Sequence, residues 1–139
     1  MPEKNIRKTK GQIESEISKA VINFEKEYMG RGPLEIKVYL VDDMVLVRLK
    51  NVLTQAELHL AQTTEGKEGR ELIKRMRIAL LEQGRPLLVA AVEGILGTKV
   101  RSLHTDISTV TGERVILFSL EARPAFSPSP SGKSNPSMG

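Results

Sequence analysis

Two parts of the chain alternate apolar and polar residues on either side of a short turn, and this pattern constrains the fold most. Aliphatic residues occupy alternate positions of residues 34–41, which predicts a strand with one buried face, because successive side chains point to opposite sides of a sheet. Asp42 and Asp43 follow and predict a two-residue hairpin turn, since aspartate tolerates unusual backbone angles. Residues 44–50 then form the second strand of the hairpin.

The same pattern returns near the end of the chain. Residues 98–108 and 114–120 are predicted strands, joined by a loop that contains Gly112. Residues 44–47 and 115–118 are apolar on both faces, which predicts that their strands lie centrally in the sheet or beneath a second layer. The two hairpins together make four antiparallel strands.

Helical periodicity precedes the first hairpin. Thr9 and Gln12 have the spacing of a capping box and begin a first helix. Gly30, Gly32 and Pro33 predict its C-cap and the following turn, because glycine accepts the left-handed conformation and proline cannot continue a helix.

The segment between the hairpins predicts two further helices. A second capping box at Thr54 begins a short helix, and the glycines within 64–69 indicate a loop or hinge. Residues 70–96 keep an apolar helical stripe through Pro86, which favours one long kinked helix; two helices that meet there are the alternative. Gly97 ends the pattern.

The expected order of elements is α-ββ-αα-ββ. We predict an α+β domain in which the helices pack on one face of a four-stranded antiparallel sheet made of the two hairpins. This single domain covers residues 10–122, with a flexible basic N-terminus at 1–9 and a disordered tail rich in proline and serine at 123–139. Apolar surface on the long helix and on the doubly apolar strands remains to be covered, which predicts a homodimer.

Composition limits the chemistry. The chain has no cysteine and two histidines, so we expect no disulfide, no metal site and no cofactor. The first residues lack the apolar region of a signal peptide, and no apolar run reaches the roughly 18 residues of a spanning helix, which predicts a cytoplasmic protein without direct membrane insertion. The net charge is +4, but basic and acidic residues are interleaved, so nucleic-acid binding is the weakest of the functions considered.

Polar side chains with catalytic potential gather in one predicted strand. Ser102, His104 and Asp106 alternate and therefore leave the same face, about 7 Å apart from one to the next. Serine triads are instead assembled from separate segments, with the base in hydrogen-bond reach of the nucleophile. We therefore expect no catalytic residue here, and we predict that these three side chains contact a partner together with Arg48 and Arg101. A hydrolytic or small-molecule site on the same face is the alternative.

Several segments together resemble a known family of small bacterial proteins. They are residues 25–28 (Glu-Lys-Glu-Tyr), 30–33 (Gly-Arg-Gly-Pro), 39–49, 53–57 (Leu-Thr-Gln-Ala-Glu), 100–108 and 111–115 (Thr-Gly-Glu-Arg-Val). Over residues 10–121 the chain resembles the domain of unknown function described as the MpsC-like component of a sodium-translocating, membrane-potential-generating system. The resemblance implies an accessory role beside a membrane system for cation or inorganic-carbon transport, and it assigns no catalytic residue.

These observations favour a non-catalytic protein. We expect an accessory or assembly factor that grips a protein partner through a groove or an exposed strand edge.

Overall fold

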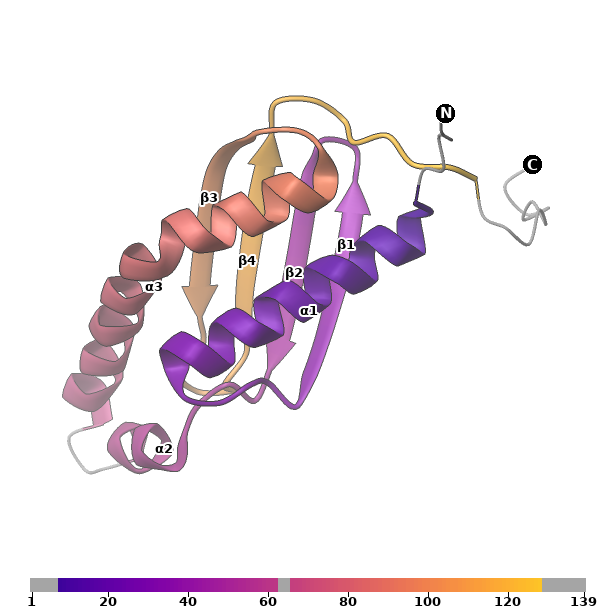
Figure 1. The fold of residues 1–139 in the computed structure, drawn as a ribbon. Coiled ribbons are helices and arrows are strands. Elements are labelled where there is room, and N and C mark those ends of the chain that lie inside the picture. The colour runs from indigo at the N-terminus through magenta and orange to yellow at the C-terminus, as the bar shows by residue number, and fades with distance from the viewer. Residues whose placement is uncertain (1–7, 63–65, 129–139) are drawn as a thin grey trace.

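The computed structural model describes residues 8–62 and 66–128, and it confirms the α+β class and the predicted order of elements (Figure 1). The elements are α1 (Lys10–Met29), β1 (Glu35–Val41), β2 (Met44–Lys50), α2 (Gln55–Ala61), α3 (Gly66–Leu96), β3 (Val100–Ile107) and β4 (Arg114–Leu120).

The four strands form one antiparallel sheet in the order β1-β2-β4-β3. Val41 pairs with Met44 across the turn at Asp42 and Asp43, and Asp42 takes the left-handed conformation with φ of 52°. The first hairpin therefore has the predicted two-residue turn. The two doubly apolar strands, β2 and β4, lie in the centre of the sheet, as the sequence predicts.

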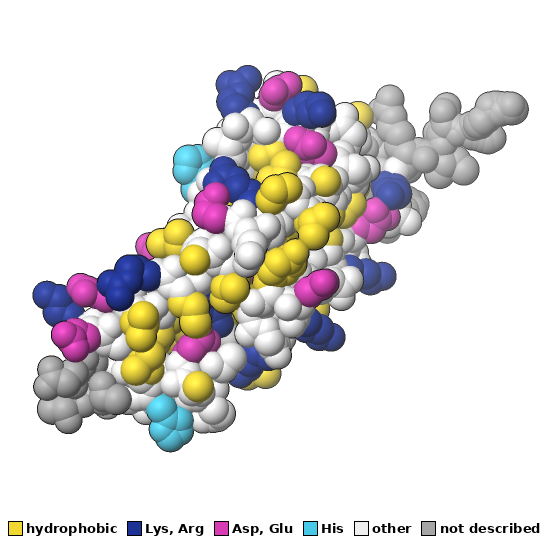
Figure 2. Space-filling view, turned by 60° about the vertical axis from the view of Figure 1, so that its left-hand side comes forward, with side chains coloured by type: hydrophobic (Ala, Val, Ile, Leu, Met, Phe, Trp, Pro, Cys, Tyr) yellow, Lys and Arg dark blue, Asp and Glu magenta, His cyan; other side chains and the backbone are white. Residues whose placement is uncertain are grey.

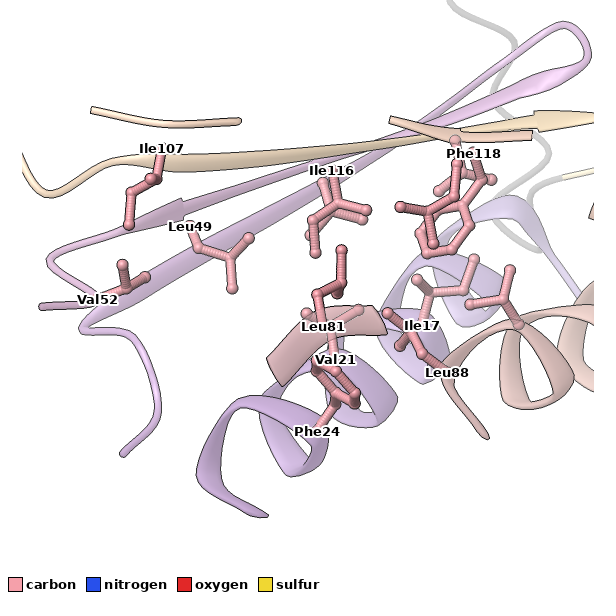
Figure 3. Packing of buried hydrophobic residues seen from close by; sticks show 14 of the residues in the cluster. Ile17, Val21, Phe24, Leu49, Val52, Leu81, Leu88, Ile107, Ile116 and Phe118 are labelled. Carbon is pink, nitrogen blue, oxygen red and sulfur yellow. The ribbon is translucent and has the colours of Figure 1, made fainter. Parts of the chain in front are cut away.

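Helices α1 and α3 cross the same face of the sheet, and the apolar core lies between the two layers (Figure 1). Figure 3 shows Ile17 and Val21 of α1 and Leu81 of α3 turned toward the sheet, where they meet Ile116 and Phe118 of β4. All five side chains are at most 2 % exposed. Their burial is the main contribution that holds the helices on the sheet, at about 25 cal/mol for each Å² removed from water.

Both predicted capping boxes are present. The Thr9 and Thr54 side chains accept hydrogen bonds from the backbone three residues on, and the Gln12 and Glu57 side chains bond back to the cap. Gly30 ends α1 in the left-handed conformation with φ of 90°, as glycine does at many helix C-termini. Gly32 and Pro33 follow in the turn before β1.

Helix α3 is a single helix that includes Pro86, so the long-helix interpretation is confirmed. Figure 1 shows that α3 bends midway. A bend is expected at Pro86, because proline cannot donate a backbone hydrogen bond and its ring clashes with the carbonyl group one turn earlier. The expected loop over 64–69 is partly wrong, because α3 already begins at Gly66; residues 64 and 65 lie outside the described part of the chain. Gly97 and Gly112 have φ of 73° and 76° in the turns before β3 and β4.

Residues 123–128, which the composition assigns to the tail, lie against the domain. Pro124 is buried, and the Ser127 amide donates a hydrogen bond of 2.9 Å to the Lys8 carbonyl. The Arg123 guanidinium donates one of 2.8 Å to Asp42 in the β1–β2 turn. The remainder of the predicted tail and most of the predicted basic N-terminus lie outside the described residues.

Candidate functional site

Four charged residues meet inside the protein, at one end of the space between the helices and the sheet. They come from four elements, and each is at most 6 % exposed: Glu25 of α1, Glu57 of α2, Arg77 of α3 and Arg114 of β4. Their formal charges sum to zero when both carboxyls are ionised. Ionised side chains are rarely buried so fully unless they are paired, so this buried charge cluster is the most unusual feature of the core.

The best-formed part of the buried charge cluster is the pair between Arg77 and Glu57. Arg77 Nε donates to Glu57 Oε2 at 2.9 Å, and Arg77 Nη2 donates to Glu57 Oε1 at 2.8 Å and to the Val52 carbonyl at 3.0 Å. The Thr54 amide donates a third hydrogen bond to the Glu57 carboxylate. Burial alone would raise the pKa of Glu57, but the hydrogen bonds from Arg77 and Thr54 outweigh it and hold that pKa below its usual value.

Glu25 is held differently. Its Oε1 lies 3.7 Å from Arg77 Nη1 and its Oε2 lies 3.5 Å from Arg114 Nη1, distances of ion pairs rather than of hydrogen bonds. Within the described chain these four atoms make no hydrogen bond to another protein group. Burial raises the pKa of Glu25, and the opposite charges of Arg114 and Arg77 offset only part of that rise.

A small cavity opens beside the two buried guanidinium groups. Its volume is about 40 Å³ and it is lined by Lys74, Arg77, Ile78, Thr105, Asp106, Ile107 and Arg114. Thr105 accepts a hydrogen bond of 3.3 Å from Arg114 Nε and donates one of 2.9 Å to the Val115 carbonyl. Lys74 and the exposed Asp106 form a 3.7 Å ion pair at the rim.

This cluster was not predicted from the sequence, in which the basic and acidic residues were described only as interleaved. A signal was present, because Arg77 stands between Ile73 and Leu81 at four-residue spacing, on the stripe that the core buries. Arg114 likewise occupies one of the alternate positions of β4 whose side chains point toward the core, as Ile116 and Phe118 do. Charged residues at positions of apolar periodicity were the available clue.

Ser102 and His104 of the predicted row lie on the sheet face opposite to the helices, whereas Asp106 lies at the edge strand β3 beside Lys74 of α3. Ser102 Oγ and His104 Nε2 are 3.1 Å apart, so the structure brings these two together. Asp106 instead accepts a hydrogen bond from the Ile107 amide and faces Lys74. Among the interactions of the described residues, none joins Asp106 to His104, and the third contact of a triad is not formed.

The two arginines predicted beside this row lie apart from each other. Arg48 of β2 pairs with Glu113 just before β4. Arg101 is exposed in β3, where the register with β4 shifts between Val100 and Ser102. The predicted partner contacts of all five residues stay a prediction.

A second concave surface, which we call the apolar groove, lies between the end of α1, α2 and the first half of α3. Its volume is about 330 Å³, and most of its lining is apolar: Met29, Ala56, Leu60, Leu72, Ile73, Met76 and Leu80, with Thr54 and Glu57. Leu72 and Met76 are 47 % and 42 % exposed, which is high for large apolar side chains. Figure 2 shows apolar side chains in a broken band on this side of the molecule.

Charged side chains of both signs flank that band. On the face in Figure 2, lysines and arginines alternate with aspartates and glutamates rather than forming one basic stripe. Across residues 8–62 and 66–128, no group of three or more histidine or carboxylate side chains is placed to hold a metal ion.

One comparison with known proteins identifies a family, and another identifies a relative. The family model described as Na+-translocating membrane potential-generating system (MpsC) matches residues 9–122. An uncharacterized protein YbcI of Bacillus subtilis (strain 168) is 45 % identical over 115 residues, which cover 83 % of this chain and 90 % of that relative. No solved structure matches. Within the described residues, no helix has the length and apolar character needed to cross a membrane.

Proposed function

Because the chain belongs to the MpsC family of the Na+-translocating membrane potential-generating system, we propose that it is a non-catalytic accessory or assembly factor of such a system and acts by binding a protein partner. The proposal places the protein in the cytoplasm, on the inner side of the membrane that carries the system. Transport of a cation or of inorganic carbon is then the process that it assists.

The apolar groove is the observation that supports protein binding. Leu72, Met76 and Leu80 follow one another at four-residue spacing along α3, and Met29 and Leu60 close the groove from the other helices. An amphipathic helix of the partner, with apolar residues at the same spacing, would bury this surface by the helix-in-groove mode. Methionine side chains suit such a surface because they adapt their shape to the ligand.

The experiment compares the groove with an exposed apolar residue elsewhere. The groove variants Leu72→Glu and Met76→Glu are set against Val110→Glu, which alters an exposed loop residue outside the groove. Each tagged protein is purified from its own cells after cross-linking, and its partners are quantified by mass spectrometry. We expect one partner in stoichiometric yield with the wild type and with Val110→Glu, and its loss with both groove variants at unchanged melting temperature. Retention of that partner by the groove variants would contradict the proposal.

One observation favours a hydrolytic function as second candidate. The contact between Ser102 and His104 has the distance that a nucleophile and its base need. Against it, the pair lies on an open sheet face and Asp106 is engaged elsewhere, so nothing orients the ring as a triad requires. A screen of ester and phosphoester substrates decides: turnover by the wild type that vanishes in His104→Ala, while the partner still binds, would establish the enzyme.

A further inference from the structure

We infer that three carboxylates close the two edges of the sheet against the addition of a strand from another copy of the chain. They are Glu14 of α1, Glu93 of α3 and Asp106 of β3, and we call them the edge carboxylates. The inference goes beyond the proposed function, because it concerns the sheet edges and holds whether or not the apolar groove binds a helix.

The strand order β1-β2-β4-β3 gives β1 and β3 one neighbour each. On the free side of such a strand, every second residue points its backbone N–H and C=O groups away from the sheet. A strand of another chain can pair with these groups, so an open edge leads to association unless the protein blocks it.

On β1 the amide of Leu40 points to the free side. Val41 and Met44 are the pair that closes the two-residue hairpin turn, so the Val41 amide faces β2 and the amide before it faces away. The Glu14 carboxylate, on the half-buried side of α1 where this helix crosses over β1 (Figure 1), accepts a hydrogen bond of 2.9 Å from the Leu40 amide. It thereby takes the place of the carbonyl that an added strand would offer.

The last amide of β3 is closed by a side chain of the same strand. The Ser108 amide donates a hydrogen bond of 2.8 Å to the Glu113 carbonyl, on the side of β4. Because successive amides of a strand point in opposite directions, the Ile107 amide faces the free edge. It donates a hydrogen bond of 2.8 Å to Asp106 Oδ1, so this amide also has its acceptor within the chain.

The first amide of β3 is closed from α3. The Lys99 carbonyl accepts a hydrogen bond of 2.9 Å from the Glu121 amide just after β4, and the amide of Val100, in the same trans peptide unit, therefore points to the free side. Glu93 Oε2 accepts a hydrogen bond of 2.8 Å from it. The register shift between Val100 and Ser102 is a further irregularity of the kind that hinders pairing at an edge.

The part of each edge that stays open is short. The outward amides between the two closed ends of β3 are those of Leu103 and Thr105, and on β1 they are those of Ile36 and Val38. Lys37 is exposed between the latter two, and a charged side chain on an edge strand disfavours pairing with a second copy. Association through the edges is therefore blocked, and partners are left with the sheet face and the helices.

A triple variant tests the inference. Glu14→Ala, Glu93→Ala and Asp106→Ala together remove the three acceptors. We expect the three capped amides to exchange hydrogen with solvent about tenfold faster than in the wild type, as measured residue by residue by NMR. We also expect the mass from light scattering to exceed that of the wild type and to rise with protein concentration. Faster exchange at the wild-type mass would overturn the proposal, and so would unchanged exchange.

A second triple variant controls for the lost charge. Glu27→Ala, Glu71→Ala and Glu82→Ala change the net charge equally at exposed helix positions away from the edges. This protein is expected to keep the wild-type mass and the wild-type exchange of the capped amides. Association of the control to the same extent would show that lost charge, rather than an open edge, drives it, and would overturn the proposal.

Single substitutions keep the test independent of the stability of the triple variant. Glu14→Gln retains an acceptor oxygen at the same reach, so it is expected to protect the Leu40 amide and to keep the wild-type mass. Glu14→Ala is expected to lose this protection and to form larger species at the same concentration and the same melting temperature. Equal masses for the two variants would contradict the role of Glu14 at the edge of β1.

Discussion

Arg77 connects three elements through its guanidinium: it bonds to Glu57 of α2 and to the Val52 carbonyl, and it faces Glu25 of α1. Replacing Arg77 by alanine would leave both carboxylates buried with less compensation. We expect Arg77→Ala to lower the free energy of unfolding by about 3–5 kcal/mol, the usual effect of removing one partner of a buried ion pair.

Arg75, exposed two residues earlier on the same helix, provides the control. Arg75→Ala is expected to stay within about 0.5 kcal/mol of the wild type, as surface substitutions usually do. Urea denaturation measures both variants. A loss below about 1 kcal/mol for Arg77→Ala would mean that the carboxylates gain protons or water without consequence for the fold.

Glu25 makes stability depend on pH in a direction opposite to that of most carboxylates. Its pKa is raised in the folded protein, so the folded state binds this proton more tightly than the unfolded state. The corresponding stabilisation is fully present below the unfolded value of 4.5 and is lost as the pH rises through the higher folded value. The wild type should therefore gain stability relative to Glu25→Gln as the pH falls from about 8 toward 5.

Urea denaturation of both proteins at a series of pH values measures this difference. Glu27→Gln, at an exposed position of the same helix, serves as the control and is expected to follow the wild-type curve. A wild type that loses stability relative to Glu25→Gln as the pH falls would contradict the raised pKa.

At the scale of the elements, Gly84 sets how closely α3 approaches α1. A Cβ atom there would lie 2.5 Å from Phe24 Cε1 and 2.9 Å from Tyr28 Cζ, and these two rings are stacked with centroids 4.8 Å apart. We expect Gly84→Ala to lower stability by about 1–3 kcal/mol, as overpacking of a core does, despite the better helix propensity of alanine.

Gly94 lies in the same helix with nothing within 4 Å of an added Cβ atom. Gly94→Ala is therefore expected to raise stability by about 0.5–1 kcal/mol, because alanine restricts the unfolded chain and favours the helix. Thermal or urea denaturation of the two variants separates packing from propensity. Stabilisation by both substitutions would show that the helices can move apart freely.

Element order, the pairing within each hairpin and both capping boxes could be predicted from the sequence because each depends on residues that are close in the chain, whereas the pairing of β2 with β4 joins distant residues such as Met44 and Ser119. The turn at Asp42 and the box at Thr54 are local in this sense. The start of α3 was placed too late, since Gly66 and Gly69 were taken as loop residues, whereas Gly69 is where α3 packs closely on Leu60. The buried charge cluster depends on residues 20 to 89 positions apart, which no local pattern connects.

At the scale of the whole molecule, the open face of the sheet bears on the predicted homodimer. A row of Tyr39, Leu46, Leu117 and His104 crosses the four strands there, and Leu46 and Leu117 stay half-buried. A second copy packed on this row would cover it. Light scattering at micromolar concentration checks the prediction: twice the chain mass is expected for the wild type and a monomer for Leu117→Glu, whereas a monomeric wild type would contradict it.

Residues 123–128 join parts of the molecule that are distant in sequence. They connect Lys8 beside the start of α1 to Asp42 at the tip of the first hairpin, and Pro124 is buried there. Leu40 and Phe126 line the same concavity. Removing residues 123–128 would therefore expose the buried Leu40 side chain to water. We expect a chain that ends at residue 122 to lose about 1–2 kcal/mol of stability, from the lost burial and hydrogen bonds.

A matched truncation isolates this effect. A chain that ends at residue 128 keeps every contact described for residues 123–128 and is expected to have the melting temperature of the full chain. The chain that ends at residue 122 is expected to have a melting temperature about 3–8 °C lower. Arg123→Ala in the full chain should account for only a small part of that shift, because the Arg123–Asp42 pair is exposed and such pairs contribute about 0–1 kcal/mol. The two truncated chains differ by residues 123–128, so any stabilising contact of this segment is lost only in the shorter one. Equal melting temperatures for the two chains would therefore show that residues 123–128 contact the domain without stabilising it.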